Sequence, residues 1–240
     1  MSPITAAVTA AQTILVQVLP PQDVLDTIAS IHEPVTTTIL DPWYNKGIGG
    51  VRDDYRQWLN RVVTESSNIS QHVFVWGFPE IVYTVLDSLP PKFGLVAWLT
   101  WYYKNCPSVI RGWRSAQLAC LHLARGGAKL YPEHFMNDAQ REKDKQGKLR
   151  YMPGPPSVIE AALNIGFVGK AEQTGHPAQK PVKVIEPLIL MTTQENDLVL
   201  DPMCGAGTTG VVCQRLNRRG ILCDESAQWI EVTKHRLASK

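Results

Sequence analysis

The sequence predicts an α/β protein of 240 residues built on a mostly parallel sheet. Residues 198–200 form a short apolar run of the kind that buried parallel strands show, and residues 211–216 resume with helical spacing after a glycine-containing turn. Residues 35–40 are β-branched and apolar, and they lead straight into a polar loop at Asp41. Since 44% of the residues are hydrophobic, the chain can supply a sizeable core, and we expect a single domain over residues 1–240.

Strand patterns alternate with helix patterns except around residues 94–175, and we expect a doubly wound sheet with helices on both faces. Strand patterns cover residues 13–19, 35–40, 72–77, 94–100, 116–123, 198–200 and 221–224. Helical spacing covers residues 23–31, 55–63, 81–89, 182–191 and 211–216, and it begins again near Ser226. We therefore expect seven strands, of which the pair at 94–100 and 116–123 gives the sheet an antiparallel edge strand.

Composition excludes several classes of protein. No apolar run approaches the roughly 20 residues of a membrane span, and the first residues lack the order of a signal peptide. The five cysteines are scattered without CxxC spacing, which argues against a disulfide framework and a zinc site and predicts no metal. The formal charge of +2 is small, so a polyanionic partner would need a local basic patch. We expect a cytoplasmic protein.

The turn at Asp201-Pro202-Met203-Cys204-Gly205-Ala206-Gly207-Thr208-Thr209 is the strongest sign of a ligand site. Two glycines let the backbone bend sharply against a ligand, and the helix that follows offers unpaired N–H groups. A triphosphate loop needs a lysine beside its Ser or Thr, and none stands here. The pattern therefore favours a nucleotide-like ligand, with an ordinary tight turn as the alternative.

Asp224 ends the next expected strand, about 20 residues after the turn, where a carboxylate can bind a ribose diol. The alternative role for Asp224 is the N-cap of the helix that begins near Ser226.

Asp41-Pro42-Trp43-Tyr44 is the second informative stretch. It places a carboxylate, a backbone without an N–H and two aromatic rings at the end of a strand, where α/β sheets bind ligands. A carboxylate and a backbone carbonyl can accept two N–H bonds from a planar amine, and a ring can stack on its face. A structural turn with aromatic rings in the core is the alternative.

Three stretches of the chain resemble the three hallmark motifs of the β-class DNA amino-methyltransferases: first the one at Asp41, then His176-Pro177-Ala178-Gln179-Lys180-Pro181, and last the one at Asp201, in that order. The similarity runs from about residue 13 to residue 240. It implies the Rossmann-like fold of S-adenosylmethionine-dependent methyltransferases with a circularly permuted motif order, in which the N-terminal strand lies beside the C-terminal one. The implied partners are S-adenosyl-L-methionine and double-stranded DNA from which the target base is flipped. The resemblance also implies that the protein is bacterial, or phage-encoded and acting in the host cytoplasm.

The resemblance also implies roles for individual residues. The catalytic motif would be Asp41, Pro42, Trp43 and Tyr44, with Tyr44 stacking on the flipped base. Cofactor binding would fall to the following residues: Asp201, Pro202, Met203, Cys204, Gly205, Gly207, Thr208, Thr209, Asp224, His176, Pro177, Lys180 and Pro181. An Asp in the catalytic motif is the more frequent choice in members that methylate N6 of adenine, so adenine is favoured over N4 of cytosine.

The sequence departs from the family pattern in two places. Trp43 stands where the family usually has a second proline, which puts the shape of the base pocket in doubt. The family also has an acid just after its first strand, whereas this chain has Gln17 and only later Asp23, which puts the adenine contacts of the cofactor in doubt.

Residues 124–175 differ in composition and form an inserted region that could recognise DNA. Within residues 141–150 five basic side chains outnumber two acidic ones, a local charge of +3. Trp113 between two arginines combines a ring for a base with cations for phosphates. The predicted DNA-binding residues are Arg111, Trp113, Arg114, Lys143, Lys145, Lys148 and Arg150. A solvated loop is the alternative, and the small size of the insert leaves room for a homodimer.

Three other functions fit parts of the sequence. An inactive subunit that binds cofactor and DNA would keep the sheet and the insert. A methyltransferase acting on RNA or protein would share the glycine turn and Asp224. An NAD-dependent oxidoreductase would share the turn alone, and it is the least favoured.

Overall fold

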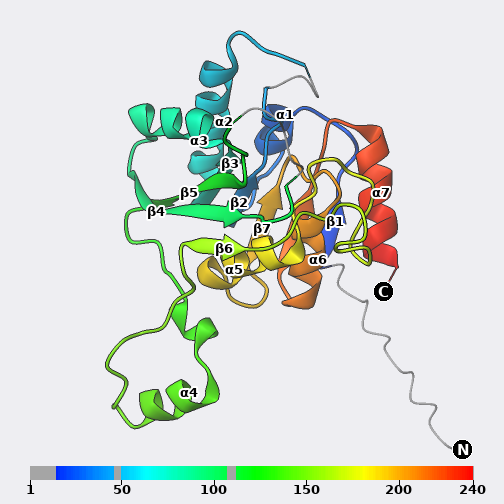
Figure 1. Cartoon of the computed structure of the whole chain (residues 1–240). Coiled ribbons are helices and arrows are strands. Elements are labelled where there is room, and N and C mark those ends of the chain that lie inside the picture. Colours follow the sequence, from blue (N-terminus) through cyan, green and yellow to red (C-terminus); the bar gives the residue numbers. More distant parts are fainter. Residues whose placement is uncertain (1–14, 46–49, 107–111, 240) are drawn as a thin grey trace, which may run out of the picture.

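The protein is described here from a computed structural model, which covers residues 15–45, 50–106 and 112–239. Within these ranges eight strands form one sheet in the order β1-β8-β7-β2-β3-β5-β4-β6 (Figure 1). The strands are β1 (Val16–Val18), β2 (Val35–Leu40), β3 (Ser70–Gly77), β4 (Phe93–Tyr102), β5 (Gln117–Arg125), β6 (Val158–Glu160), β7 (Leu198–Asp201) and β8 (Arg219–Leu222).

Five adjacent strands, from β1 through β8, β7 and β2 to β3, run parallel. Strand β5 is antiparallel to both of its neighbours, β3 and β4, and β6 pairs parallel with β4. The predicted mostly parallel α/β sheet is thus confirmed, with an eighth strand in addition to the seven expected. Because β6 covers β4, the edge of the sheet is β6 and the antiparallel strand β5 lies inside the sheet.

The two ends of the described chain meet in the sheet. Strand β1 pairs with β8 in the register Val16 to Gly220 and Val18 to Leu222, and the Leu19 N–H donates to the Leu222 carbonyl at 2.8 Å. This pairing confirms the expectation that the N-terminal strand completes the sheet beside the C-terminal one.

Helices cover both faces of the sheet. One face packs against α1 (Val24–Ala29), α2 (Tyr55–Ile69) and α3 (Pro79–Val82), the last continuing as a 3-10 helix, η1 (Tyr83–Ser88). The other face packs against α5 (Val182–Thr192) and α6 (Thr208–Arg215), and α7 (Ala227–Ala238) lies next to α6 and β1. The apolar stripes of these helices bury Val35, Val73 and Leu200 on one side and Ile39, Phe74 and Val199 on the other.

Part of the inserted region projects from the body as a lobe, which we define as residues 136–157 (Figure 1). It holds α4 (Asp138–Lys145), preceded by a short 3-10 helix, η2 (Pro132–Phe135). A capping box begins α4: the Asn137 side chain accepts from the Gln140 N–H, and the Gln140 side chain accepts from the Asn137 N–H, both at 2.9 Å. No side chain of α4 is buried, so this cap and not packing defines where the helix begins.

Two buried histidines join β3 to β5. His72 and His122 are 1% and 3% exposed, and their Nδ1 and Nε2 atoms lie 3.1 Å apart. The Nε2 atom of His72 lies 3.1 Å from the carbonyl of Lys129, and the His122 ring stacks on Phe74. Burial lowers the pKa of His72, and burial together with the neighbouring His72 lowers the pKa of His122 to about 3.

This pair should make the fold sensitive to acid. Both imidazoles bind protons more readily in the unfolded chain, near the ordinary pKa of 6.5, so the stability that they confer is present above pH 6.5 and is lost as the pH falls below it. Urea unfolding of the wild type and of His122→Phe measures this effect. From pH 6.5 to 5 we expect the wild type to lose stability relative to the variant by up to about 1.4 kcal/mol per pH unit. A difference independent of pH would contradict this role.

Candidate active site

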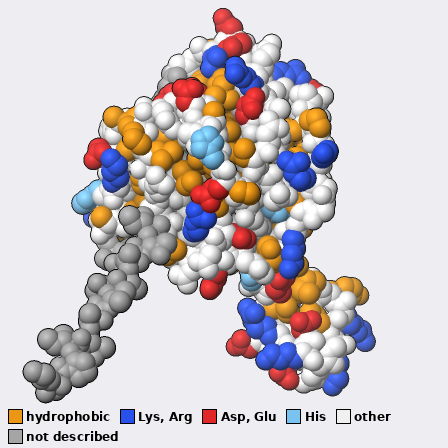
Figure 2. Space-filling model, turned by 180° about the vertical axis from the view of Figure 1, so that it is seen from behind, with side chains coloured by type: hydrophobic (Ala, Val, Ile, Leu, Met, Phe, Trp, Pro, Cys, Tyr) orange, Lys and Arg blue, Asp and Glu red, His pale blue; other side chains and the backbone are white. Residues whose placement is uncertain are grey.

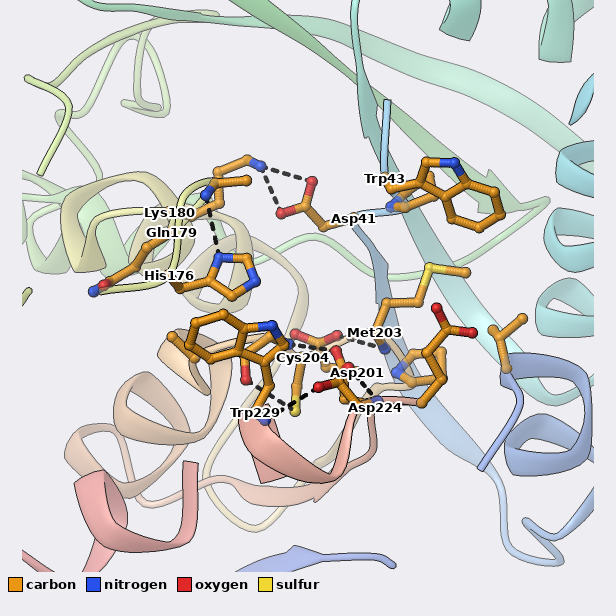
Figure 3. A pocket seen from close by; sticks show the side chains of 18 of the residues that line it. Asp41, Trp43, His176, Gln179, Lys180, Asp201, Met203, Cys204, Asp224 and Trp229 are labelled. Atoms are coloured by element: carbon orange, nitrogen blue, oxygen red, sulfur yellow. Dashed lines mark hydrogen bonds and ion pairs between the residues drawn. The ribbon is translucent and has the colours of Figure 1, made fainter. Parts of the chain in front are cut away.

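The ends of two neighbouring parallel strands create a cleft. Strands β2 and β7 pair directly, so their carboxyl ends lie at the same edge of the sheet. Asp41 follows β2 and the glycine turn follows β7, and both line one cavity of about 400 Å³ (Figure 3). Two loops that are some 160 residues apart in the chain therefore share a single cleft, as their motifs predict.

Most of the residues predicted for the site line this cavity. From the catalytic motif these are Asp41, Pro42, Trp43 and Tyr44, and from the cofactor set they are His176, Pro177, Lys180, Asp201, Pro202, Met203, Cys204, Gly205, Thr208, Thr209 and Asp224. Gly207 and Pro181 are not among the lining residues. The cavity is also lined by residues outside the predicted set of individual site residues: Asp23, Val24, Arg52, Trp58, Ala178, Gln179, Ile185, Ala206, Glu225, Ser226 and Trp229.

Both glycines of the turn occupy positions where a Cβ atom would not fit. Gly205 has φ +48° and Gly207 has φ +72°, in the left-handed region that side chains disfavour. A Cβ on Gly205 would lie 2.9 Å from Nε2 of His176, and one on Gly207 would lie 2.6 Å from the Thr233 side chain. Gly207 is the N-cap of α6, and the first two residues of that helix, Thr208 and Thr209, line the cleft.

The Asp224 carboxylate fixes the turn from the opposite side. One oxygen accepts from the Gly205 N–H and the other from the Ser226 N–H, each at 2.9 Å. The N-cap of α7 is Ser226, whose side chain accepts from the Trp229 N–H, and Asp224 precedes it. Asp224 is therefore a cleft residue that links the turn to α7, and it is not the cap itself.

Asp201 lies at the floor of the cleft and is 4% exposed. Its carboxylate accepts from the Thr209 hydroxyl at 2.5 Å and from the Met203 N–H at 3.2 Å. Burial raises the pKa of Asp201 to about 7, although both hydrogen bonds act to lower it. These contacts connect the end of β7 to the first turn of α6.

The loop that carries the His176 motif is held closed by its own side chains. Gln179 accepts at 3.0 and 2.8 Å from the N–H and hydroxyl of Thr174, and it donates to the Glu172 carbonyl at 2.6 Å. His176 packs edge-on against Trp229, with ring centroids 4.4 Å apart, and burial lowers its pKa. The loop thus forms a rigid wall across from the glycine turn (Figure 3).

Lys180 extends from this loop to the catalytic motif. Its Nζ atom lies 2.6 and 2.5 Å from the two carboxylate oxygens of Asp41 (Figure 3). The same atom lies 2.9 Å from the Tyr44 hydroxyl. The sequence placed Lys180 among the cofactor residues, and its charged end lies against the catalytic motif instead of the glycine turn.

The two aromatic rings of the motif point in different directions. Tyr44 packs edge-on against Phe78 at 5.0 Å, and burial and the charge of Asp41 raise its pKa to about 12. Trp43 packs against Tyr55 and Trp58 of α2, and its carbonyl accepts from the Tyr55 hydroxyl at 2.5 Å. Trp43 therefore occupies the rim toward α2, on the side away from Lys180 (Figure 3).

Asp23 supplies a carboxylate to the cleft although the usual acid after the first strand is absent. It caps α1 by accepting from the Leu25 N–H at 2.7 Å, and it lines the cleft at the end where Asp224 lies. The chain thus supplies a carboxylate there from a later position. The N-cap pattern before Val24 could have identified the position of Asp23 but not its exposure to the cleft.

Of the residues predicted to bind DNA, none of those that the structure describes lines the cleft. Arg111 lies outside the described residues. Trp113 is 99% exposed and Arg114 is exposed beside it. Lys143, Lys145, Lys148 and Arg150 are exposed on the lobe, where basic and acidic side chains are interspersed (Figure 2).

The described part of the chain contains no helix with the length and apolar character of a membrane span.

With the cleft defined, the chain can be placed among known proteins. The model of the family described as "DNA methylase" (N6_N4_Mtase) matches residues 35–235. The chain belongs to this family, which confirms the resemblance of its three motifs to the DNA amino-methyltransferases.

Two relatives illustrate the similarity. The Type II methyltransferase M.HpaI of Haemophilus parainfluenzae is 31% identical over 222 residues, which cover 84% of this chain and 68% of that protein. The Type II methyltransferase M2.DpnII of Streptococcus pneumoniae is 29% identical over 189 residues, covering 77% of this chain and 66% of that protein. The chain thus spans about two thirds of the length of these relatives.

Solved structures share the fold. The M1.HpyAVI-SAM complex superposes with a TM-score of 0.70 at 22% identity, covering 92% of this chain and 98% of that one. The PvuII DNA methyltransferase, described as cytosine-N4-specific, gives a TM-score of 0.72 at 17% identity and covers 92% and 86%. The predicted methyltransferase-type sheet is confirmed by this likeness.

Proposed function

We propose that this protein is a site-specific DNA methyltransferase that transfers a methyl group from S-adenosylmethionine to the exocyclic amine of a flipped base, N6 of adenine. The observation that carries the proposal is the single cleft in which Asp41 and the Gly205 turn face each other. Relatives that are Type II methyltransferases support the site-specific action on DNA.

The cleft suits S-adenosylmethionine in size and charge. A cavity of about 400 Å³ lies within the range of small-molecule sites, roughly 300–1,000 Å³. Its walls carry five carboxyl groups, those of Asp23, Asp41, Asp201, Asp224 and Glu225, against two basic side chains, Arg52 and Lys180, and this excess of acids favours a ligand bearing a sulfonium and an ammonium. Asp224 would accept from the ribose hydroxyls, and Asp23 would face the adenine amine.

Asp41 and Pro42 would prepare the target amine. The lone pair of an exocyclic amine is delocalised into the ring, so the nitrogen is a poor nucleophile. N–H bonds to the Asp41 carboxylate and the Pro42 carbonyl would favour a pyramidal nitrogen and aim its lone pair into the cleft. S-adenosylmethionine held at the glycine turn would supply a sulfonium methyl. The amine nitrogen would take this methyl as the C–S bond breaks, and it would lose one proton to solvent. Positioning and electrostatics then account for the rate.

Identifying the modified base tests this function. DNA of mixed sequence would be incubated with the protein and S-adenosylmethionine, digested to nucleosides and analysed by mass spectrometry. N6-methyladenine is the expected product. N4-methylcytosine would move the proposal to the other base, while duplex binding without any methylated base would favour an inactive DNA-binding subunit.

The basic side chains of the lobe would contact phosphates. Replacing Lys143, Lys145, Lys148 and Arg150 together by Gln should weaken duplex binding and reduce the slope of log Kobs against log salt by about 0.9 for each lost phosphate contact. Since all four are exposed, the fold should be unaffected. Lys183→Gln, at an exposed lysine of α5, is the control. An unchanged slope in the fourfold variant would remove the lobe from the DNA interface.

A further inference from the structure

We propose that Lys180 is a positioning residue for methyl transfer: its buried ammonium holds the Asp41 carboxylate and the Tyr44 hydroxyl in the arrangement that receives the target amine. This inference rests on the proposed function. It gives the lysine of the His176 motif a task in the transfer step in place of cofactor binding.

The hydrogen bonds of Lys180 leave no donor for a cofactor. An ammonium has three N–H groups, and the Nζ atom has three acceptors within 2.9 Å: both oxygens of Asp41 and the hydroxyl of Tyr44. The two oxygens of Asp41 retain further lone pairs. The ion pair therefore fixes the carboxylate while leaving it able to accept an N–H from the base.

Lys180 is buried more deeply than Asp41. The Lys180 side chain is 4% exposed and that of Asp41 is 20% exposed. Around the Nζ atom lie the rings of Tyr44, Trp76 and Trp101, with centroids 5.5, 5.5 and 5.8 Å away. These contacts keep the ammonium behind the carboxylate, so an incoming amine meets Asp41 on its cleft side.

The backbone of Lys180 is fixed as firmly as its side chain. Its carbonyl accepts from the Thr208 hydroxyl at 2.8 Å, and that hydroxyl accepts from Nη1 of Arg236 at 3.0 Å. Thr208 is the first residue of α6, directly after the glycine turn. Lys180 thus joins the turn proposed to hold the cofactor to the carboxylate proposed to hold the amine, and it sets the distance between them.

The contacts of Lys180 favour its ammonium form. Burial alone would lower the pKa of Lys180, but the charge of Asp41 and the hydrogen bonds to Asp41 and Tyr44 raise it above its usual value. An ammonium that stays protonated cannot take the proton of the methylated amine. Its effect must come through the position and charge of Asp41.

A double-mutant cycle tests the inference. Lys180→Met, Asp41→Asn and the double variant would be compared in single-turnover methyl transfer at saturating cofactor and DNA, with Lys183→Met as the exposed control. We expect Lys180→Met to lower the rate by about a hundredfold in the wild-type background and by less than threefold beside Asp41→Asn, because the lysine acts through the carboxylate. Affinity for S-adenosylmethionine should stay within threefold in every variant.

Two results would overturn the inference. A large loss of cofactor affinity in Lys180→Met with an unchanged saturated rate would assign the lysine to the cofactor. Faster transfer or tighter duplex binding in Lys180→Met would make the lysine a competitor that the amine must displace.

Thermal unfolding of the wild type, the two single variants and the double variant gives a readout that does not depend on activity. Each single variant leaves one buried partner uncompensated and should lower the melting temperature, and the double variant should recover part of that loss. Additive losses would contradict the pairing. If the wild type transferred no methyl group to any DNA, the proposed function would fail, while this cycle would still decide whether Lys180 holds Asp41.

Discussion

Replacing Asp41 by alanine should lower the rate of methyl transfer by about a thousandfold or more, which corresponds to about 4 kcal/mol of barrier. The carboxylate would make charge-assisted hydrogen bonds to the amine, and these strengthen as the nitrogen gains positive charge on methylation. The effect should appear in kcat, since the interaction is stronger in the transition state than in the bound substrate.

Cofactor binding separates this loss from unfolding. Asp41 lies at the end of β2, whereas the proposed ribose contact comes from Asp224, so Asp41→Ala should bind S-adenosylmethionine with an affinity within threefold of the wild type. Asp53→Ala removes a nearby exposed carboxylate and should behave as the wild type in both assays. Full activity of Asp41→Ala would exclude the assigned role.

Replacing Asp224 by alanine should weaken S-adenosylmethionine binding by about a hundredfold, or about 2.7 kcal/mol. Two losses combine in this variant. The ribose loses its charged acceptor, and the N–H groups of Gly205 and Ser226 lose the carboxylate that holds the turn against α7. The rate at saturating cofactor should fall far less, because Asp224 does not contact the catalytic motif.

Calorimetric titration of S-adenosylmethionine measures this effect, with Glu195→Ala as an exposed control away from the cleft. A variant that kept wild-type affinity and lost only its rate would show that the ribose is bound elsewhere. The result would then favour a purely structural role for Asp224 beside the Ser226 cap.

The sheet and the two loops of the cleft could be predicted because their signals are local. Apolar runs that end at Asp41 and Asp201 mark parallel strands, and the glycines at 205 and 207 mark a backbone that side chains cannot follow. The family resemblance supplied the order of the motifs and hence the pairing of β1 with β8.

Other features depend on contacts that local patterns do not contain. Strand β6 has three residues, Val158–Glu160, too few for a periodicity, and it forms because β4 offers an open edge. Helix α4 buries no side chain and begins at the Asn137 cap inside a polar segment. The ion pair of Lys180 with Asp41 joins residues 139 positions apart, so only the folded sheet reveals it.

Identifying the two atoms that the transferred methyl group joins tests the central proposal most directly. DNA carrying 15N at the exocyclic amines would be incubated with S-adenosylmethionine carrying 13C in its methyl group, and the recovered nucleosides would be examined by NMR. We predict a one-bond 13C–15N coupling in the methylated nucleoside, and its loss with Asp41→Ala. Label on a ring carbon, or label found only in RNA or protein, would contradict the proposal that the shared cleft brings a sulfonium methyl to a DNA amine.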